Sequence, residues 1–112
     1  MAAGAYDIHI EQGATCQRTW TCISDDGSPY PWTGWQARAQ IRTAAAENGD
    51  LILDLTPHLT LDGHVITLVI PAAVTETLTR HGRWDMELYD TTTGYVVRLL
   101  QGQATLSKEV TR

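Results

Sequence analysis

The amino-acid sequence predicts one all-β domain, built as a sandwich or a barrel. Apolar and polar residues alternate with a period of two in several segments, which is typical of half-buried strands. Turn signals rich in Gly, Asp and Asn separate these segments at short intervals. Only one stretch is a candidate for a helix, so the pattern favours packed β-sheets over alternating βαβ units.

Length and composition fit one globular domain that covers residues 1–112. The formal net charge is −5, and the eight Lys and Arg residues are scattered along the chain. Both features disfavour nucleic acid and an anionic membrane surface as main partners, because phosphate binding needs clustered cations. The first residues lack a basic region followed by a long apolar run. We therefore expect a protein that is made in the cytoplasm and stays soluble.

The first strands are expected at Tyr6–Glu11 and in the segment that contains the two cysteines. In that segment Cys16, Trp20 and Cys22 lie on one face, which we assign to the core. Arg18 interrupts this inner row, so it lies at a rim or the strand is bulged there. The two cysteines are about 20 Å apart if the segment is extended, and a disulfide needs less than about 7 Å. We expect two free, buried thiols.

The central and late strands show the clearest alternation. Inner and outer residues alternate from Trp35 to Arg42 and again from Arg83 to Leu88. Turns are predicted at Asp25–Pro29, Asn48–Asp50, Leu61–His64 and Asp90–Gly94. The third of these is expected to form a tight hairpin that leads into a strand at Val65–Ile70. A last strand is expected at Tyr95–Leu106, with a bulge or bend at Gly102.

The remaining element is a short connector at Pro71–Thr79. Proline suits the first turn of a helix, but three threonines in this stretch are poor helix formers. We expect a short helix or a single turn between strands, and eight or nine strands in all.

We find no residue pattern typical of an enzyme, a metal site or a cofactor site. His9, His58, His64 and His81 lack metal-ligand spacing, and we expect each to face solvent. The serines lie in no nucleophile elbow, the glycines form no phosphate-binding loop, and the aspartates form no EF-hand. The sequence thus predicts a non-enzymatic protein without a cofactor.

The most unusual stretch is an aromatic cluster at Tyr30–Trp35, which holds Tyr30, Trp32 and Trp35. Three interpretations remain open. The rings could seal one end of a core that contains no Phe, they could form a protein interface, or they could stack on a sugar. The third interpretation would make the chain a carbohydrate-binding module.

Several short motifs resemble a group of small bacteriophage and prophage structural proteins. The motifs are Ile10-Glu11-Gln12-Gly13-Ala14-Thr15, Thr33-Gly34-Trp35-Gln36-Ala37, Gln40-Ile41-Arg42, Trp84-Asp85-Met86-Glu87-Leu88, Arg98-Leu99-Leu100-Gln101-Gly102 and Glu109-Val110-Thr111. The group is similar in pattern to the N-terminal domain of the upper baseplate protein of lactococcal phages. This resemblance implies an immunoglobulin-like β-sandwich of about eight or nine antiparallel strands with one short connecting helix.

The resemblance also implies a role in the virion. It suggests a tail, baseplate or fibre-attachment adaptor, or a head decoration, made in the bacterial host cytoplasm and present in several copies. Such a protein acts by docking to other virion proteins, and an edge near Tyr6–Glu11 would be covered by one of them or by a symmetry copy. The candidate interface residues are Tyr30, Trp32, Trp35, Arg38 and Arg42.

An immunoglobulin-like strand order further predicts that the strand from Trp35 pairs with the penultimate strand, Trp84–Tyr89. Arg38 and Arg42 would then face Asp85 and Glu87 across the pair, as a ladder of opposite charges on an outer face. Alternatively, the two arginines contact an acidic partner surface.

Overall fold

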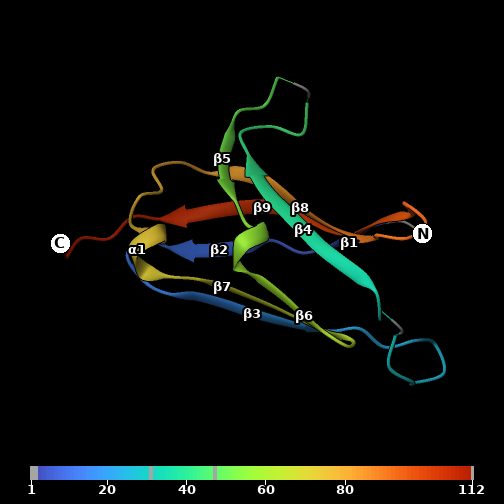
Figure 1. Ribbon diagram of the computed structural model, residues 1–112. Helices are drawn as coiled ribbons and strands as arrows, with labels where there is room; N and C mark the ends of the chain where they lie inside the picture. The colour runs from blue at the N-terminus through green and yellow to red at the C-terminus, as the bar shows by residue number, and fades with distance from the viewer. Residues whose placement is uncertain (1–2, 31, 47, 112) are drawn as a thin grey trace.

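The computed structural model describes residues 3–30, 32–46 and 48–111, and the strands within them form two packed sheets (Figure 1). The larger sheet has the order β1-β9-β8-β4-β5, with β2 also beside β9, and the smaller has the order β3-β7-β6. The strands are β1 (Gly4–Ala5), β2 (Ile8–Glu11), β3 (Cys16–Thr21), β4 (Trp35–Arg42), β5 (Leu51–Asp54), β6 (Leu59–Asp62), β7 (Val65–Ile70), β8 (Gly82–Asp90) and β9 (Val96–Ser107). The all-β prediction is confirmed.

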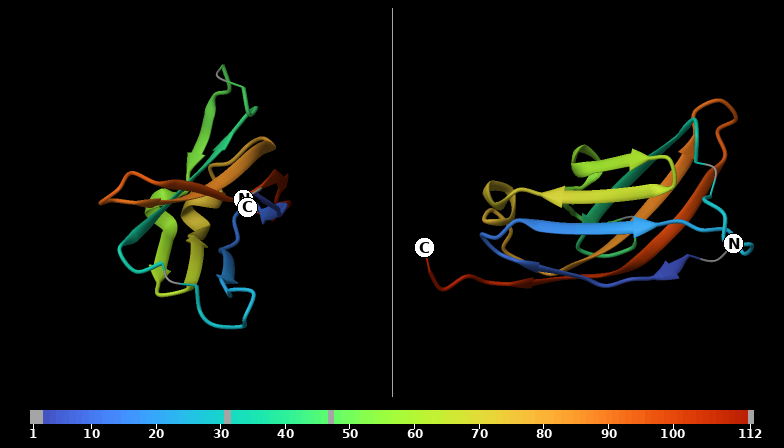
Figure 2. Two further views of the ribbon diagram at one scale, coloured as in Figure 1. Left: turned by 90° about the vertical axis from the view of Figure 1, so that its right-hand side faces the viewer. Right: turned by 90° about the horizontal axis from the view of Figure 1, so that it is seen from below.

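The core lies between the two sheets. Seen from below, the smaller sheet lies in front of the larger one (Figure 2). The predicted inner rows of β4 and β8 are the buried ones, because Ala39, Ile41, Trp84, Met86 and Leu88 all face the core. The short β2 adds Ile8 and Ile10, which are almost completely buried.

The N-terminal strand departs from the expected antiparallel arrangement. It is divided into β1 and β2, and both pair with β9 in parallel. Between them the chain stays beside β9 in the same register, and the backbone N–H of Tyr6 donates to the carbonyl of Gln101 (2.9 Å). The carboxylate of Asp7 accepts from the N–H of Gln103 (2.9 Å). The two short strands therefore behave as one edge strand that is interrupted at Tyr6 and Asp7.

Gly102 lies beside this interruption. The sequence predicts a bulge or bend there, and the bulge is wrong. The residue pairs in register with Trp84, and the irregularity of the β8–β9 pair lies at Met86/Glu87, opposite Leu99. A side chain at Gly102 would collide with the carbonyl oxygen of Tyr6. Glycine is needed here because another segment of backbone approaches closely.

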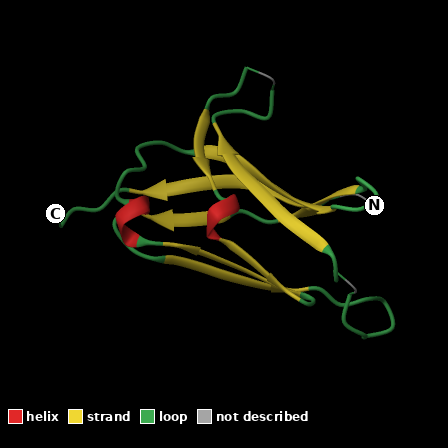
Figure 3. Cartoon of the chain, in the orientation of Figure 1, coloured by secondary structure: helices red, strands yellow, loops and turns green. Residues whose placement is uncertain are grey.

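The turns and the short helix follow the sequence pattern. The β6–β7 hairpin turns at Gly63, whose φ is +60°. The helix α1 (Ala72–Thr75) begins after Pro71 and makes a single turn, and a 3-10 turn η1 (Thr56–His58) precedes β6 (Figure 3). Within the described ranges, no helix is long and apolar enough to cross a membrane.

The buried hydroxyl of Thr75 fixes α1 to the loop that joins the sheets. It donates to the carbonyl of Ala14 (2.8 Å) and accepts from the N–H of Gly13 (3.1 Å). Nearby, the amide of Gln12 donates to the carbonyl of Leu78 (2.7 Å) and accepts from the N–H of Glu109 (3.0 Å). These bonds close one end of the core with satisfied polar groups.

The structure decides the predictions made for Arg18 and for the two cysteines in and after β3. Arg18 lies at a rim, where its guanidinium donates to the carbonyl of His9 (2.9 Å), and the β3–β7 register runs without a bulge. Both cysteines are free, as expected. Cys16 is buried, but Cys22, which follows the last residue of β3, is only partly buried.

Candidate functional site

Four aromatic side chains form a row at one end of the molecule, which we call the aromatic row: Tyr30, Trp32, Trp35 and Tyr95. Neighbouring ring centroids are 4.3, 5.0 and 6.1 Å apart along it. Trp32 is buried, with 3% of its surface exposed, whereas Tyr95 is 65% exposed. The row thus runs from the core to the surface.

Local turn chemistry places the first three rings together. Gly34 has a φ of +83°, and the N–H of Trp35 donates to the carbonyl of Trp32 (3.0 Å), which makes a tight turn. The N–H of Tyr30 donates to the carbonyl of Cys22 (3.0 Å), so the loop closes on itself before it reaches Trp32. The turn therefore brings Trp32 and Trp35 into edge contact.

The long β8–β9 hairpin supplies the rest of the site. Asp90 continues the inner row of β8 and pairs with Trp35, and Val97 lies opposite Leu88 on the same face. At this end the hairpin extends beyond the smaller sheet (Figure 2). The inner face of the larger sheet is therefore left uncovered near Tyr95.

A hollow of about 440 Å³ lies at this uncovered end. Its lining residues are Tyr30, Trp32, Trp35, Asp90, Thr93, Tyr95 and Val97. Asp90 is the one charged residue among them, and one of its carboxylate oxygens accepts from the N–H of Thr92 (2.9 Å). The indole N–H of Trp32 is buried without a hydrogen-bond partner among the described residues. The hollow combines aromatic surface with a single negative charge.

The two arginines predicted as interface residues lie on the opposite, outer face of the same sheet. Arg38 pairs with Glu87 (2.8 Å), and its guanidinium carbon lies 4.8 Å from the ring centroid of Tyr89. The predicted pairing of β4 with β8 is therefore right, and Arg38 and Glu87 are directly opposite in the register. The aromatic residues and the arginines belong to two separate surfaces.

The other half of the predicted charge ladder is wrong. Arg42 lies opposite Arg83, not opposite a carboxylate. Its guanidinium donates to the side chain of Gln40 (2.9 Å) and to the carbonyl of Gly49 (3.0 Å). Asp85 instead pairs with an arginine of β9, Arg98, at 3.5 Å. The register of the antiparallel pair decides this outcome, because it sets Gln40 opposite Asp85.

A polar groove of about 350 Å³ follows this outer face. Its lining residues are Gln40, Arg42, Ala44, Ala45, Arg83, Trp84, Asp85, Glu87, Arg98 and Gln101. Partial burial, and secondarily the neighbouring carboxylate of Glu87, raise the pKa of Asp85. Since both carboxylates of the groove pair with arginines, we assign its charges mainly to holding the strand register.

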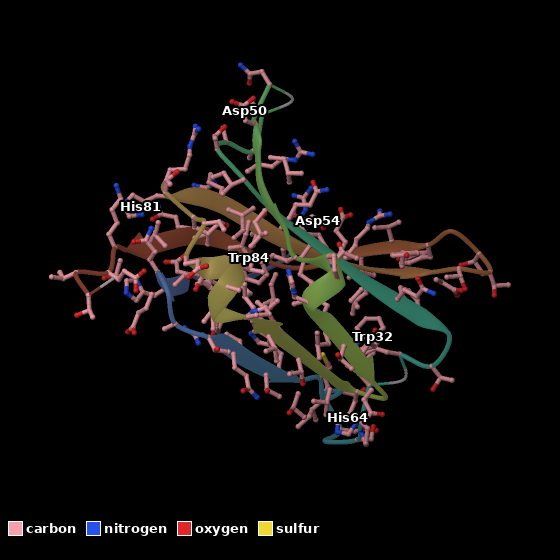
Figure 4. The ribbon with its side chains drawn as sticks, turned by 60° about the vertical axis from the view of Figure 1, so that its left-hand side comes forward. Trp32, Asp50, Asp54, His64, His81 and Trp84 are labelled. Atoms are coloured by element: carbon pink, nitrogen blue, oxygen red, sulfur yellow. The ribbon has the colours of Figure 1, made fainter. Side chains whose placement is uncertain are left out.

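The histidines of the described residues form no metal-binding group. Figure 4 shows His64 at the β6–β7 hairpin and His81 far from it. His9 and His81 are exposed, but His58 and His64 are partly buried, so the expectation that all four face solvent is wrong for two of them. His81 accepts from the N–H of Leu106 (2.9 Å), a structural role. Across the described part of the chain, no group of three or more His, Cys, Asp or Glu could hold a metal ion.

Tyr95 and Asp90 are the site residues that the sequence analysis missed. The sequence does indicate the position of Asp90. It follows Trp84, Met86 and Leu88 at a spacing of two, so it belongs to the same inner face of the strand. Figure 4 shows Trp32 and Trp84 in different parts of the core. Trp84 belongs to a second aromatic cluster with Tyr6 and Trp20, whose rings contact each other inside the molecule.

Comparisons with known proteins do not assign the site. A scan against models of known protein families finds no match, and a search of curated proteins finds none either. The function is therefore inferred from the geometry of the aromatic end and from the motifs of the sequence.

Proposed function

We propose that this chain is a non-enzymatic docking domain of a bacteriophage particle, which binds other virion proteins through its aromatic end. The observation that supports docking is the exposure of this end. Tyr95 is 65% exposed, next to three further aromatic rings. Aromatic side chains at the centre of an apolar patch are enriched at protein interfaces and dominate their binding energy.

The particle and the immunoglobulin-like assignment come from the sequence resemblance. Two packed sheets and the pairing of β4 with β8 support that assignment. A position in the tail, baseplate or fibre attachment, with several copies per particle, agrees with a small domain that has open sheet edges at β2 and β5.

Sugar binding is the second candidate, because a carboxylate lies beside aromatic rings in the hollow. Two features make it weaker than protein docking. Trp32 is almost completely buried and offers no open ring face. The planes of neighbouring rings meet at 64° for Trp32 and Trp35 and at 68° for Trp35 and Tyr95, so they form walls instead of a flat platform.

The test is incorporation into particles, measured with point substitutions. Deleting residues 1–11 would remove the edge near Tyr6–Glu11 that a partner is expected to cover. It is unsuitable as a test of docking, because it also removes Ile8 and Ile10 from the core. In cells that carry the gene and produce phage, tagged protein is followed through density-gradient purification of particles. The double variant Tyr95→Ala with Val97→Ser changes two residues that line the hollow. It is compared with Val110→Ser, which changes an equally apolar side chain that is 93% exposed elsewhere.

We expect the wild type and Val110→Ser to co-purify with particles, and the double variant to be depleted at unchanged thermal stability. Absence of the wild-type protein from particles would contradict the virion role. Normal incorporation of the double variant would show that docking does not use the aromatic end.

A further inference from the structure

We infer that the hollow at the aromatic end binds the cationic side chain of an arginine or lysine from a partner protein. This inference rests on the docking function proposed above and adds the chemistry of the group that is recognised. It depends on three features of the hollow: the ring arrangement, the charge of its lining, and the contrast with the polar groove on the outer face.

The rings are arranged as the walls of a cation site. The faces of aromatic rings carry negative electrostatic potential, and a cation is attracted within about 6 Å of a ring centroid. The centroids of Trp35 and Tyr95 are 6.1 Å apart and their planes meet at 68°. A compact cation in the hollow can therefore lie close to two rings at once, whereas a flat sugar ring can stack on only one of them.

The charge of the lining also favours a cation. Asp90 contributes a carboxylate, and no Lys or Arg is found among the described residues that line the hollow. One carboxylate oxygen is held by the N–H of Thr92, which fixes the orientation of the group. The other oxygen has no hydrogen-bond partner within the described residues. Hydrogen bonds between a carboxylate and a cationic side chain are short and strong, and arginine can also stack on an aromatic face.

On the outer face of the same sheet, the carboxylates already have cationic partners, unlike Asp90 in the hollow, which has none among the described residues. There the carboxylates of Asp85 and Glu87 already pair with Arg98 and Arg38. Arg38 also lies over the ring of Tyr89, so this chain itself contains a guanidinium held by one aromatic ring and one carboxylate. The hollow offers the same two kinds of group, Tyr95 and Asp90, without an internal cation. A partner's basic side chain supplies the missing component.

The experiment titrates the full chain with short blocked peptides of the form acetyl-Gly-X-Gly-amide, in which X is Arg, Lys or Gln. Nuclear magnetic resonance of the four tryptophan indole N–H groups reports where each peptide binds. We expect the Arg and Lys peptides to shift the signals of Trp32 and Trp35. The signals of Trp20 and Trp84, in the other aromatic cluster, serve as an internal control and should not move.

Three substitutions test the two recognising groups. Tyr95→Ala should weaken binding of the basic peptides about fivefold, and Tyr95→Phe should preserve it, since the ring supplies the attraction. Asp90→Asn keeps an acceptor for Thr92 but loses the charge, so it should also weaken binding about fivefold. Asp62→Asn, at the exposed β6–β7 hairpin, is the matched control and should bind as the wild type does.

Several outcomes overturn the inference. Equal binding of the Gln peptide, or no effect of Asp90→Asn, would show that positive charge is not recognised. Binding of a methyl glucoside or of free choline in preference to both basic peptides would assign the hollow to sugars or to choline headgroups. If no peptide binds while the Tyr95→Ala and Val97→Ser variant still fails to enter particles, docking at the aromatic end stands and only the cationic group is wrong.

Discussion

Reversing the charge of Arg38 tests whether the outer-face charges hold the register of β4 and β8. Arg38→Glu removes an ion pair with Glu87 and a contact with the ring of Tyr89. It also places two carboxylates directly opposite each other across the strand pair, close to Asp85.

The magnitude follows from the exposure of the groups. The side chains of Arg38 and Glu87 are 47% and 26% exposed, so the ion pair contributes about 0.5 kcal/mol. The cation–π contact contributes about 0.5–1 kcal/mol at such a site, and the new repulsion costs about as much as the ion pair contributes. We expect the free energy of unfolding to fall by about 1.5–2 kcal/mol, which lowers Tm by about 6–8 °C in a domain of this size.

A double-mutant cycle separates the pair from its surroundings. Urea unfolding is measured for Arg38→Glu, for Glu87→Arg and for the variant that carries both. The double variant restores the opposite charges, but the new arginine faces Arg98 on β9, so we expect only partial recovery. The coupling energy should be about 0.5 kcal/mol or more at low salt and should shrink as salt is added.

A coupling energy of zero at low salt would refute the argument that these charges fix the register. If Arg38→Glu leaves stability unchanged and still prevents incorporation into particles, the arginine belongs to an interface and contacts an acidic partner instead.

Three further predictions concern the core and the outer face. Gly102→Ala should lower the free energy of unfolding by about 2–3 kcal/mol in urea titration, because it displaces the backbone at Tyr6 and with it hydrogen bonds worth about 1 kcal/mol each; an unchanged midpoint would contradict this. Under native conditions a thiol reagent should label Cys22 before Cys16, since burial raises the pKa of the Cys16 thiol, and mass spectrometry showing equal rates would disprove it. The folded state binds the Asp85 proton more tightly than the unfolded chain does, because its pKa is raised above 3.8. The contribution of Asp85 to stability therefore falls as pH rises through that raised pKa, so Asp85→Asn should lose less stability than the wild type between about pH 4 and pH 7; parallel pH profiles would contradict this.

The sequence predicts the faces of strands well and their partners less well. The inner rows of β4 and β8 could be read directly, because burial in a sheet repeats every two residues. The same periodicity holds for parallel and antiparallel strands, so it could not show that β1 and β2 run parallel to β9. Gly102 was ambiguous for a similar reason. A glycine within a strand marks either a bulge or a close approach of backbone, and only the position of Tyr6 decides between them.

The candidate site shows the same limit. Tyr30, Trp32 and Trp35 could be predicted to lie together, because one short turn contains them all. Tyr95 and Asp90 come from a hairpin far along the chain, and their place beside Trp35 depends on the register of β4 with β8. The neighbour of Arg42 depends on that register too. Two-residue alternation predicts that Arg42 lies on the outer face, but it does not predict that Arg83 lies opposite.

The unequal lengths of the two sheets connect the core to the aromatic end. β9 has twelve residues and β7 has six, so at about 3.3 Å per residue the larger sheet extends roughly 20 Å further. Part of its inner face must then be covered by something other than the smaller sheet. Trp32 and Trp35 cover the first part, and Tyr95 continues the apolar surface into solvent. Sealing of the core and docking are therefore not competing explanations of the Tyr30–Trp35 cluster, because the buried rings support the exposed ones that a partner would contact.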